Sequence, residues 1–140
     1  MLKTDFIKKS NQLQGKLSEI YLRPKIEHKF KTKFKMTHYH HPFDFISENI
    51  YIELKTRNNN YNKYPTTMIG HNKLIKAREL KNKNIKTYFF FRFTDGIYYI
   101  RYTDKLLDNI KSKIGGRFDR GCKELNLYSY IPIDQLKRLE

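Results

Sequence analysis

The sequence predicts an α/β fold in which helices flank a mixed central sheet. Residues 50–57 alternate apolar and polar side chains with period two, which is typical of a strand with one buried face. Residues 85–93 hold a run of bulky apolar side chains, which is typical of a strand covered on both faces. Apolar residues at helical spacing in 5–22 and about 67–80 predict the flanking helices.

The composition indicates a polyanionic partner. The sequence has 140 residues, with 29 Lys and Arg against 14 Asp and Glu, and so a net charge of +15. This excess favours nucleic acid first and an anionic membrane surface second. A biased genome is an alternative reason for many lysines, but it leaves the scarcity of acids unexplained. The length predicts a single domain over residues 1–140.

Cysteine content and hydropathy predict the compartment. Cys122 is the only cysteine, which excludes an internal disulfide and a four-cysteine zinc site. Residues 1–15 hold no apolar segment of signal-peptide length, and the longest apolar run, residues 88–91, is far too short to span a bilayer. We therefore expect a soluble intracellular protein, cytoplasmic or nuclear, that is not secreted and has no membrane partner.

The first predicted element is a helix over about residues 5–22 that ends before Pro24. One apolar stripe runs along it, formed by Phe6, Leu13, Leu17, Ile20 and Tyr21. Glu19 lies on a different face of this helix. It is either a solvated surface charge or a carboxylate directed at a functional site.

Residues 28–37 alternate cleanly and predict a half-buried strand. Its polar face carries a lysine row formed by Lys29, Lys31, Lys33 and Lys35. Such a row either solvates and protects a sheet edge or follows a phosphate backbone. The histidines that follow, in residues 38–41, predict a turn rather than a metal site, because no other group at ligand spacing accompanies them.

The stretch that carries candidate chemistry is the β-ribbon predicted over residues 42–57. Asp44 precedes a turn at residues 47–49, and the next strand places Glu53 and Lys55 on one face. If Asp44 ends the partner strand, all three side chains meet at one point. Two carboxylates and an ammonium there can hold a divalent cation and a water against a phosphate. The alternative is an ion pair of Glu53 and Lys55 on the surface, which is worth little to stability.

The remaining elements follow in order. Thr66 or Thr67 caps the basic helix that runs to about residue 80. Asp95-Gly96 predicts a hairpin into a strand over 97–102. Three more elements complete the chain: a helix from Thr103-Asp104 to residue 114, which ends at Gly115-Gly116, a strand over 125–131 and a short helix over 133–139.

The order of a helix, a strand, an Asp-bearing strand, a Glu-x-Lys strand, a helix and a strand resembles the PD-(D/E)XK nuclease superfamily. The resemblance covers about residues 5–100 and implies the restriction-endonuclease-like fold with its αβββαβ core. Gly15-x-x-x-Glu19 also looks like the helix motif of the resolvase-like branch. The proline, Pro42, stands two residues before Asp44 instead of directly before it.

This resemblance implies a Mg²⁺-dependent endonuclease, with Mn²⁺ as an alternative ion, that cuts DNA in a resolvase-like, repair-like or restriction-like manner and works as a homodimer. Asp44, Glu53 and the Leu54 carbonyl would bind the metal, and Glu19 would add a ligand. Lys55 would orient the attacking water or stabilise developing charge. The residues expected to contact nucleic acid are Arg57, His71, Lys73 and the lysine row.

Two other functions fit the same residues. One is a catalytically inactive nucleic-acid-binding protein of the same fold. The other is a basic interaction protein whose partner is an acidic protein or a membrane, in which case the aromatic stretches serve only the core.

Overall fold

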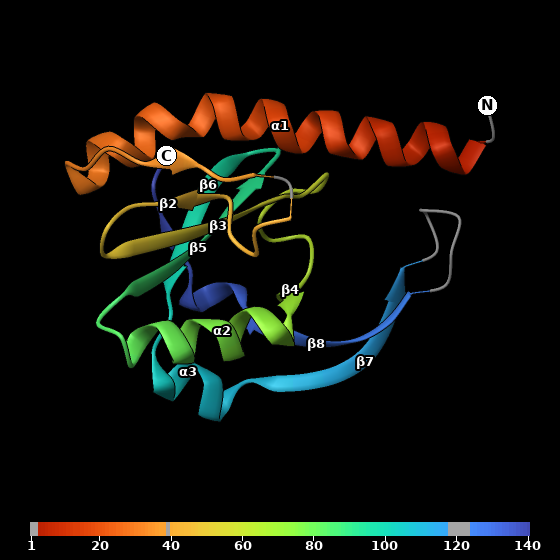
Figure 1. Cartoon of the computed structure of the whole chain (residues 1–140). Coiled ribbons are helices and arrows are strands. Elements are labelled where there is room, and N and C mark those ends of the chain that lie inside the picture. Colours follow the sequence, from red (N-terminus) through yellow and green to blue (C-terminus); the bar gives the residue numbers. More distant parts are fainter. Residues whose placement is uncertain (1–2, 39, 118–123) are drawn as a thin grey trace.

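The computed structural model describes residues 3–38, 40–117 and 124–140, so that Cys122 lies outside the described residues. It holds a six-stranded sheet of order β1-β2-β3-β5-β6-β9 and a three-stranded sheet of order β4-β8-β7 (Figure 1). The elements are α1 (Lys3–Phe30), β1 (Lys35–Met36), β2 (Phe45–Ile46), β3 (Ile50–Thr56), β4 (Thr66–Gly70), α2 (His71–Lys81), β5 (Lys86–Phe93), β6 (Gly96–Arg101), α3 (Asp104–Asn109), β7 (Lys111–Arg117), β8 (Glu124–Pro132), the 3-10 turn η1 (Ile133–Gln135) and β9 (Lys137–Arg138).

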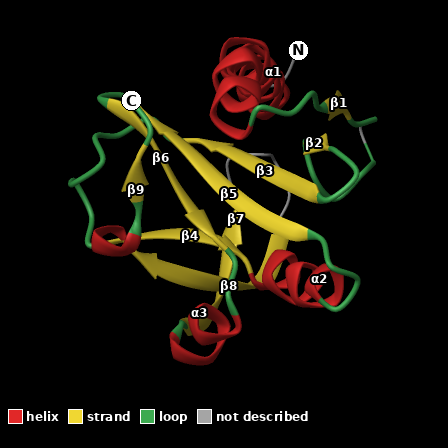
Figure 2. Cartoon of the chain, turned by 90° about the vertical axis from the view of Figure 1, so that its left-hand side faces the viewer, coloured by secondary structure: helices red, strands yellow, loops and turns green. Residues whose placement is uncertain are grey.

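The six-stranded sheet is mixed, as predicted. β3 and β5 pair in parallel, because the chain crosses over through α2 between them, and the other neighbours pair antiparallel. α1 covers one face of this sheet, while α2 and α3 lie on the other side (Figure 2). The α/β architecture with a mixed sheet between helices is confirmed, and it agrees with the restriction-endonuclease-like fold.

The two faces of β3 belong to two different cores. Ile52 and Leu54 point to the face covered by α1, where they pack with Leu22 and Ile26; we call this the α1 face. Tyr51 packs in the other core with Phe43, on the face that carries Glu53 and Lys55. We call that side the α2 face. The alternation predicted for this strand is therefore confirmed.

α1 is longer than predicted, and the expectation that Pro24 ends it is wrong. The proline lies inside the helix and is exposed. It has no N–H to give to the carbonyl of residue 20, but this carbonyl lies in an exposed turn where water can bind it. The helix then continues to Phe30, so that Leu22 and Ile26 reach the core.

The predicted apolar stripe of α1 does not face the core. Between residues 9 and 30 of this helix, the buried residues are Ser18, Leu22 and Ile26, at i, i+4 and i+8. The N-terminal part of α1 extends beyond the sheet (Figure 1). The described members of the stripe are exposed, namely Leu13, Leu17, Ile20 and Tyr21.

The strand predicted over residues 28–37 is also wrong. Its first residues belong to α1, and only Lys35–Met36 pair with β2. Lys31 has a left-handed φ of 52°, and the Thr32 N–H donates to the Glu27 carbonyl, which is a Schellman-type helix end. Glycine normally marks such an end. A lysine in its place leaves the helix end invisible in the sequence, and the lysine row does not share one strand face.

Several elements after residue 65 differ from the prediction. Residues 66–70 form β4 instead of a helix start, and α2 begins only after Gly70, which provides no side-chain cap. Thr103 caps α3 as predicted by accepting from the Leu106 N–H, but α3 ends at Asn109 and the chain continues as β7. Instead of a closing helix there are η1 and β9. None of the described helices has the length and apolar character needed to cross a membrane.

Candidate active site

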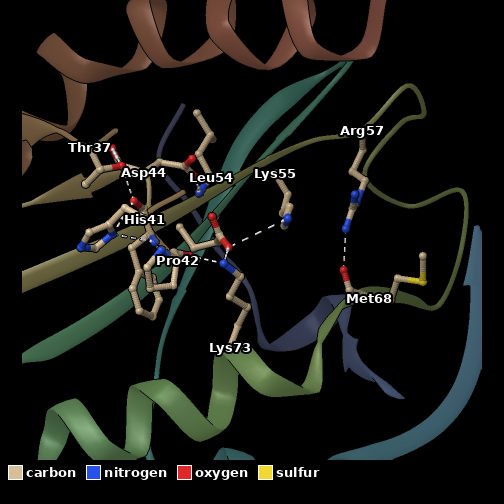
Figure 3. A network of polar contacts seen from close by, with 11 residues as sticks. Thr37, His41, Pro42, Asp44, Leu54, Lys55, Arg57, Met68 and Lys73 are labelled. Atoms are coloured by element: carbon tan, nitrogen blue, oxygen red, sulfur yellow. Dashed lines mark hydrogen bonds and ion pairs between the residues drawn. The ribbon is translucent and has the colours of Figure 1, made fainter. Parts of the chain in front are cut away.

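The β2–β3 ribbon places Asp44 beside the middle of β3. The Ser47 N–H donates to the Ile50 carbonyl at 2.8 Å and closes the turn predicted there. The Asp44 N–H donates to the Ile52 carbonyl at 2.9 Å, while its Oδ2 accepts from the Leu54 N–H at 2.7 Å. The carboxylate of Asp44 thus continues the ribbon after the backbone pairing has ended (Figure 3).

The segment before Asp44 is fixed by side chains that bond to the backbone. The Thr37 hydroxyl donates to the carbonyls of Phe43 and Asp44, and the Thr37 N–H donates to the Asp44 carbonyl at 3.1 Å. His41 Nδ1 lies 3.0 Å from the Phe43 N. The histidines of this segment therefore form a turn, as predicted, and the turn limits how far Asp44 can move.

Glu53 is the buried acid of the site, with only 4% of its surface exposed. Lys73 Nζ lies 2.9 Å from its Oε2 and Lys55 Nζ lies 3.9 Å away. Figure 3 shows the two lysines pointing toward each other from α2 and β3. Among the described residues, this oxygen makes ion pairs with the two lysines but no contact that meets the angular criteria of a hydrogen bond.

Burial and charge set the ionisation of Glu53. Desolvation is the largest effect and, with the neighbouring Asp44 carboxylate, raises the pKa of Glu53 from 4.5 to about 8, whereas Lys55 and Lys73 lower it. Two carboxyl groups share this place, as predicted. A further positive charge would favour the ionised form of Glu53.

Lys73 enters the site from the first turn of α2. Its ammonium donates to the Pro42 carbonyl and lies 5.5 Å from the centre of the Phe43 ring. The positive end of the helix dipole points the same way, and no acidic residue stands in that first turn to neutralise it. The sequence predicted Lys73 only as a nucleic-acid contact. Its approach to Glu53 depends on the crossover between β3 and β5, which no local pattern encodes.

The donor atoms of the site fit a hard divalent cation. Glu53 Oε2 is buried without a hydrogen bond, and Asp44 lies beside it. The Leu54 N–H points toward Asp44, and its carbonyl lies on the same edge of the strand. In the described part of the chain, no group of three Asp, Glu, His or Cys side chains could hold a metal. Two carboxylates and one carbonyl suit Mg²⁺, which keeps several of its waters.

The structure does not bring Glu19 to this group. Glu19 lies on α1, which packs on the opposite face of the sheet, and its carboxylate is 3.5 Å from Lys16. The neighbouring Ser18 is the residue that faces inward. Its hydroxyl accepts from Thr56 at 2.8 Å and from Arg92 at 3.2 Å. A role for Glu19 as a metal ligand stays a prediction.

Arg57 and His71 are held by the second sheet. Arg57 lies on the α2 face with Glu53, and its guanidinium donates to the Met68 carbonyl and to the Thr67 hydroxyl. His71 Nδ1 lies 2.8 Å from Ser129 Oγ on β8. Arg57 connects the end of β3 to β4, and His71 connects α2 to β8. Their contact with nucleic acid stays a prediction.

The lysine row is dispersed. Lys29 lies on the last turn of α1, and Lys31 and Lys33 lie in the exposed segment that follows it. Lys35 lies on β1, at the edge of the six-stranded sheet. Contrary to the prediction, the four lysines therefore do not contact phosphates from one strand face, and a contact by any one of them stays a prediction.

A mixed sheet between helices, with an acid directly before one strand and Glu-x-Lys on the next, is the arrangement of nucleases of the PD-(D/E)XK class. A family model described as "Phage putative PDDEXK endonuclease" matches residues 11–139, and the chain belongs to that family. Nucleases of this class cut nucleic acid and generally use divalent metal ions. A comparison with curated proteins finds no match.

Proposed function

We propose that the protein is a Mg²⁺-dependent endonuclease that hydrolyses DNA phosphodiester bonds, in a resolvase-like, repair-like or restriction-like role. The observation that carries this proposal is the convergence of Asp44, Glu53, Lys55 and Lys73, with a buried carboxylate oxygen that lacks a hydrogen bond. Such a group costs stability in a protein that does not use it.

Each side chain has a separate task in this proposal. Asp44, Glu53 and the Leu54 carbonyl would hold the metal ion. When bound, the ion lowers the pKa of a water and neutralises charge on the phosphate oxygens. Lys55, whose side chain is 36% exposed at the edge of the site, orients the attacking water with its ammonium or stabilises the charge that develops on the phosphate.

Lys73 has a positioning task. Its ammonium lies against Glu53 and favours the ionised carboxylate that a cation requires. Because Lys73 also donates to the Pro42 carbonyl, it connects α2 to the turn that carries Asp44. The side chain thus keeps the two acids at a fixed separation.

The test is cleavage of a mixed set of DNA substrates, including linear duplex, single strand, flap and four-way junction, with Mg²⁺, Mn²⁺ or EDTA. We expect cleavage of at least one substrate with either metal and none with EDTA. Binding without cleavage under every metal condition would instead support the inactive nucleic-acid-binding protein. Size-exclusion chromatography with light scattering tests the proposed homodimer on the same samples.

A further inference from the structure

A second basic region lies away from Glu53, between α1 and α3 at the β6–β9 edge of the six-stranded sheet. A groove of about 590 Å³ runs between the last turn of α1, strands β5 and β6, helix α3 and strand β9. We call it the distal groove. Four of its lining residues are cations and none is acidic, and the cations are Lys29, Arg101, Lys105 and Lys137.

Strand register explains why aromatic and basic side chains gather there. Tyr88 on β5 lies opposite Arg101 on β6, and Tyr99 on β6 lies opposite Lys137 on β9. Residues directly opposite in antiparallel strands project to the same face. The two pairs therefore form one alternating layer of two rings and two cations.

The cations of the distal groove differ from those surface lysines that are neutralised by an ion pair. Lys16, Lys25, Lys76 and Lys81 each lie within 4.0 Å of a carboxylate. Among the described residues, none of the four groove cations makes such a pair. Four uncompensated charges on one concave surface attract an anionic ligand.

Lys29 is fixed in position before any ligand arrives. Its ammonium lies 4.3 Å from the centre of the Tyr99 ring and donates to the Tyr99 hydroxyl at 3.0 Å. An ammonium has three donors, so two remain for an anion. A held cation loses less conformational entropy on binding than a free lysine does.

The aromatic wall points to the class of ligand. The Tyr88 ring packs at 4.7 Å on Phe30 and at 6.4 Å from Tyr99, and it stays partly exposed. Partly exposed rings beside a row of cations suit single-stranded nucleic acid, because bases stack on the rings and phosphates lie along the cations. The bases of a duplex are paired and stacked on each other. The groove volume of about 590 Å³ lies within the range of small-molecule binding sites.

We propose that the distal groove, at the β6–β9 edge of the sheet and away from Glu53, binds an unpaired segment of a nucleic-acid strand. The inference rests on the proposed function in one respect, that nucleic acid is the substrate. The groove holds a strand while the acids act elsewhere on the same molecule or on its partner strand.

The first experiment measures fluorescence anisotropy of a labelled oligothymidylate of about eight nucleotides in EDTA. The groove variant is R101A/K105A/K137A, and the matched control is K63A/K83A/K86A, which removes the same charge from exposed lysines outside the groove. We expect the groove variant to bind at least about tenfold more weakly, with a salt slope smaller by about 2. The control should stay within about twofold of the wild type. Equal losses in both variants, or none in the groove variant, would overturn the proposal.

The second experiment separates bases from bare charge. Tyr88→Leu should weaken oligothymidylate binding about fivefold or more while leaving competition by inorganic polyphosphate unchanged. An oligonucleotide with a photoactivatable pyrimidine should crosslink to the Tyr88 peptide. A Tyr88→Leu protein that binds as the wild type does would reduce the groove to a general anion site and contradict the inference.

The outcome is separable from that of the proposed function. If the wild type cuts no substrate but oligonucleotide binding still depends on the groove, the nuclease proposal fails and the groove stands. If the groove variant cuts and binds the oligonucleotide as the wild type does, the groove proposal fails and the nuclease stands. Thermal melts of each variant confirm that it is folded.

Discussion

The two faces of β3 differ in whether their buried polar side chains have hydrogen-bond partners. On the α1 face, Thr56 and Arg92 donate to the Ser18 hydroxyl, and the surrounding residues are apolar. On the α2 face, Glu53 is just as inaccessible, yet one of its oxygens has no hydrogen bond among the described residues. Around Ser18 the α1 face is therefore arranged for stability, whereas the α2 face keeps a buried acid whose ionisation is unfavourable and which a bound cation would favour.

The comparison is sharpest for the residues at the ends of the ribbon. Asp44→Ala and Lys55→Ala should each lower the rate of cleavage by at least about 10²-fold while DNA affinity changes only a few-fold, because the lost groups act on the reacting phosphate. Gel-based cleavage and anisotropy binding measure the two effects. Glu48→Ala, at the exposed turn of the same ribbon, is the control and should cut normally. If either site variant cuts at the wild-type rate, the substituted residue has no role in cleavage.

Glu53→Gln should separate activity from stability. A carboxyl whose pKa rises from 4.5 in the unfolded chain to about 8 in the fold keeps its proton only when folded, so the fold loses stability as pH rises between these values. The amide removes that loss. We expect no cleavage but a higher melting temperature at pH 8–9, equivalent to a few kcal/mol.

The same variant tests the metal. Mg²⁺ or Mn²⁺ at about 100 times its dissociation constant should stabilise the wild type by about 2.7 kcal/mol and leave Glu53→Gln unchanged. Glu27→Gln is the matched control from the α1 side, where the carboxylate already accepts from the Phe34 N–H at 2.8 Å. It should keep the metal response. A metal-induced shift in Glu53→Gln equal to that of the wild type would contradict the ligand assignment.

Lys73→Ala should have a smaller effect that depends on pH. Loss of this cation raises the pKa of Glu53 further, so the carboxylate ionises only at higher pH. Cleavage should fall about tenfold near pH 7 and recover on the alkaline side, which moves the pH–rate profile by about one unit. Lys76→Ala on the exposed side of α2 should leave the profile in place. A uniform loss at all pH values would assign Lys73 to another role.

Ser18→Ala should have the smallest effect, and it should change stability instead of cleavage. It leaves Thr56 and Arg92 without their acceptor and should cost about 1–2 kcal/mol of unfolding free energy. Urea denaturation measures this. Cleavage per folded molecule should not change. Ser10→Ala, exposed on the same helix, should alter neither quantity, and a loss of activity in Ser18→Ala would mean that the α1 face contributes to the chemistry.

Local sequence patterns were sufficient to predict the β2–β3 ribbon and the central strands. The alternation in residues 50–56 and the turn at residues 47–49 place Asp44 beside Glu53 through contacts close in sequence. The hairpin at Asp95-Gly96 was predicted for the same reason. The PD-(D/E)XK resemblance followed from these elements and is confirmed by the family match.

Features that depend on distant partners were missed. β4 is short and is stabilised by pairing with β8, more than fifty residues further along the chain, so its five residues looked like the start of a helix. The end of α1 is set by a left-handed Lys31, which has no sequence signature. Lys73 reaches Glu53 only because α2 packs across the sheet. In each case tertiary contacts outweighed local propensity.

The parallel pairing of β3 with β5 has a consequence for the order of folding. The ribbon of residues 44–56 can close as a local hairpin, but its parallel neighbour must wait for the whole of α2 to be synthesised and to cross over. A chain interrupted before residue 86 holds Asp44, Glu53 and Lys55 but lacks the strand that buries the second acid. On the ribosome, Glu53 is therefore not buried until the crossover is complete, and the candidate site forms late.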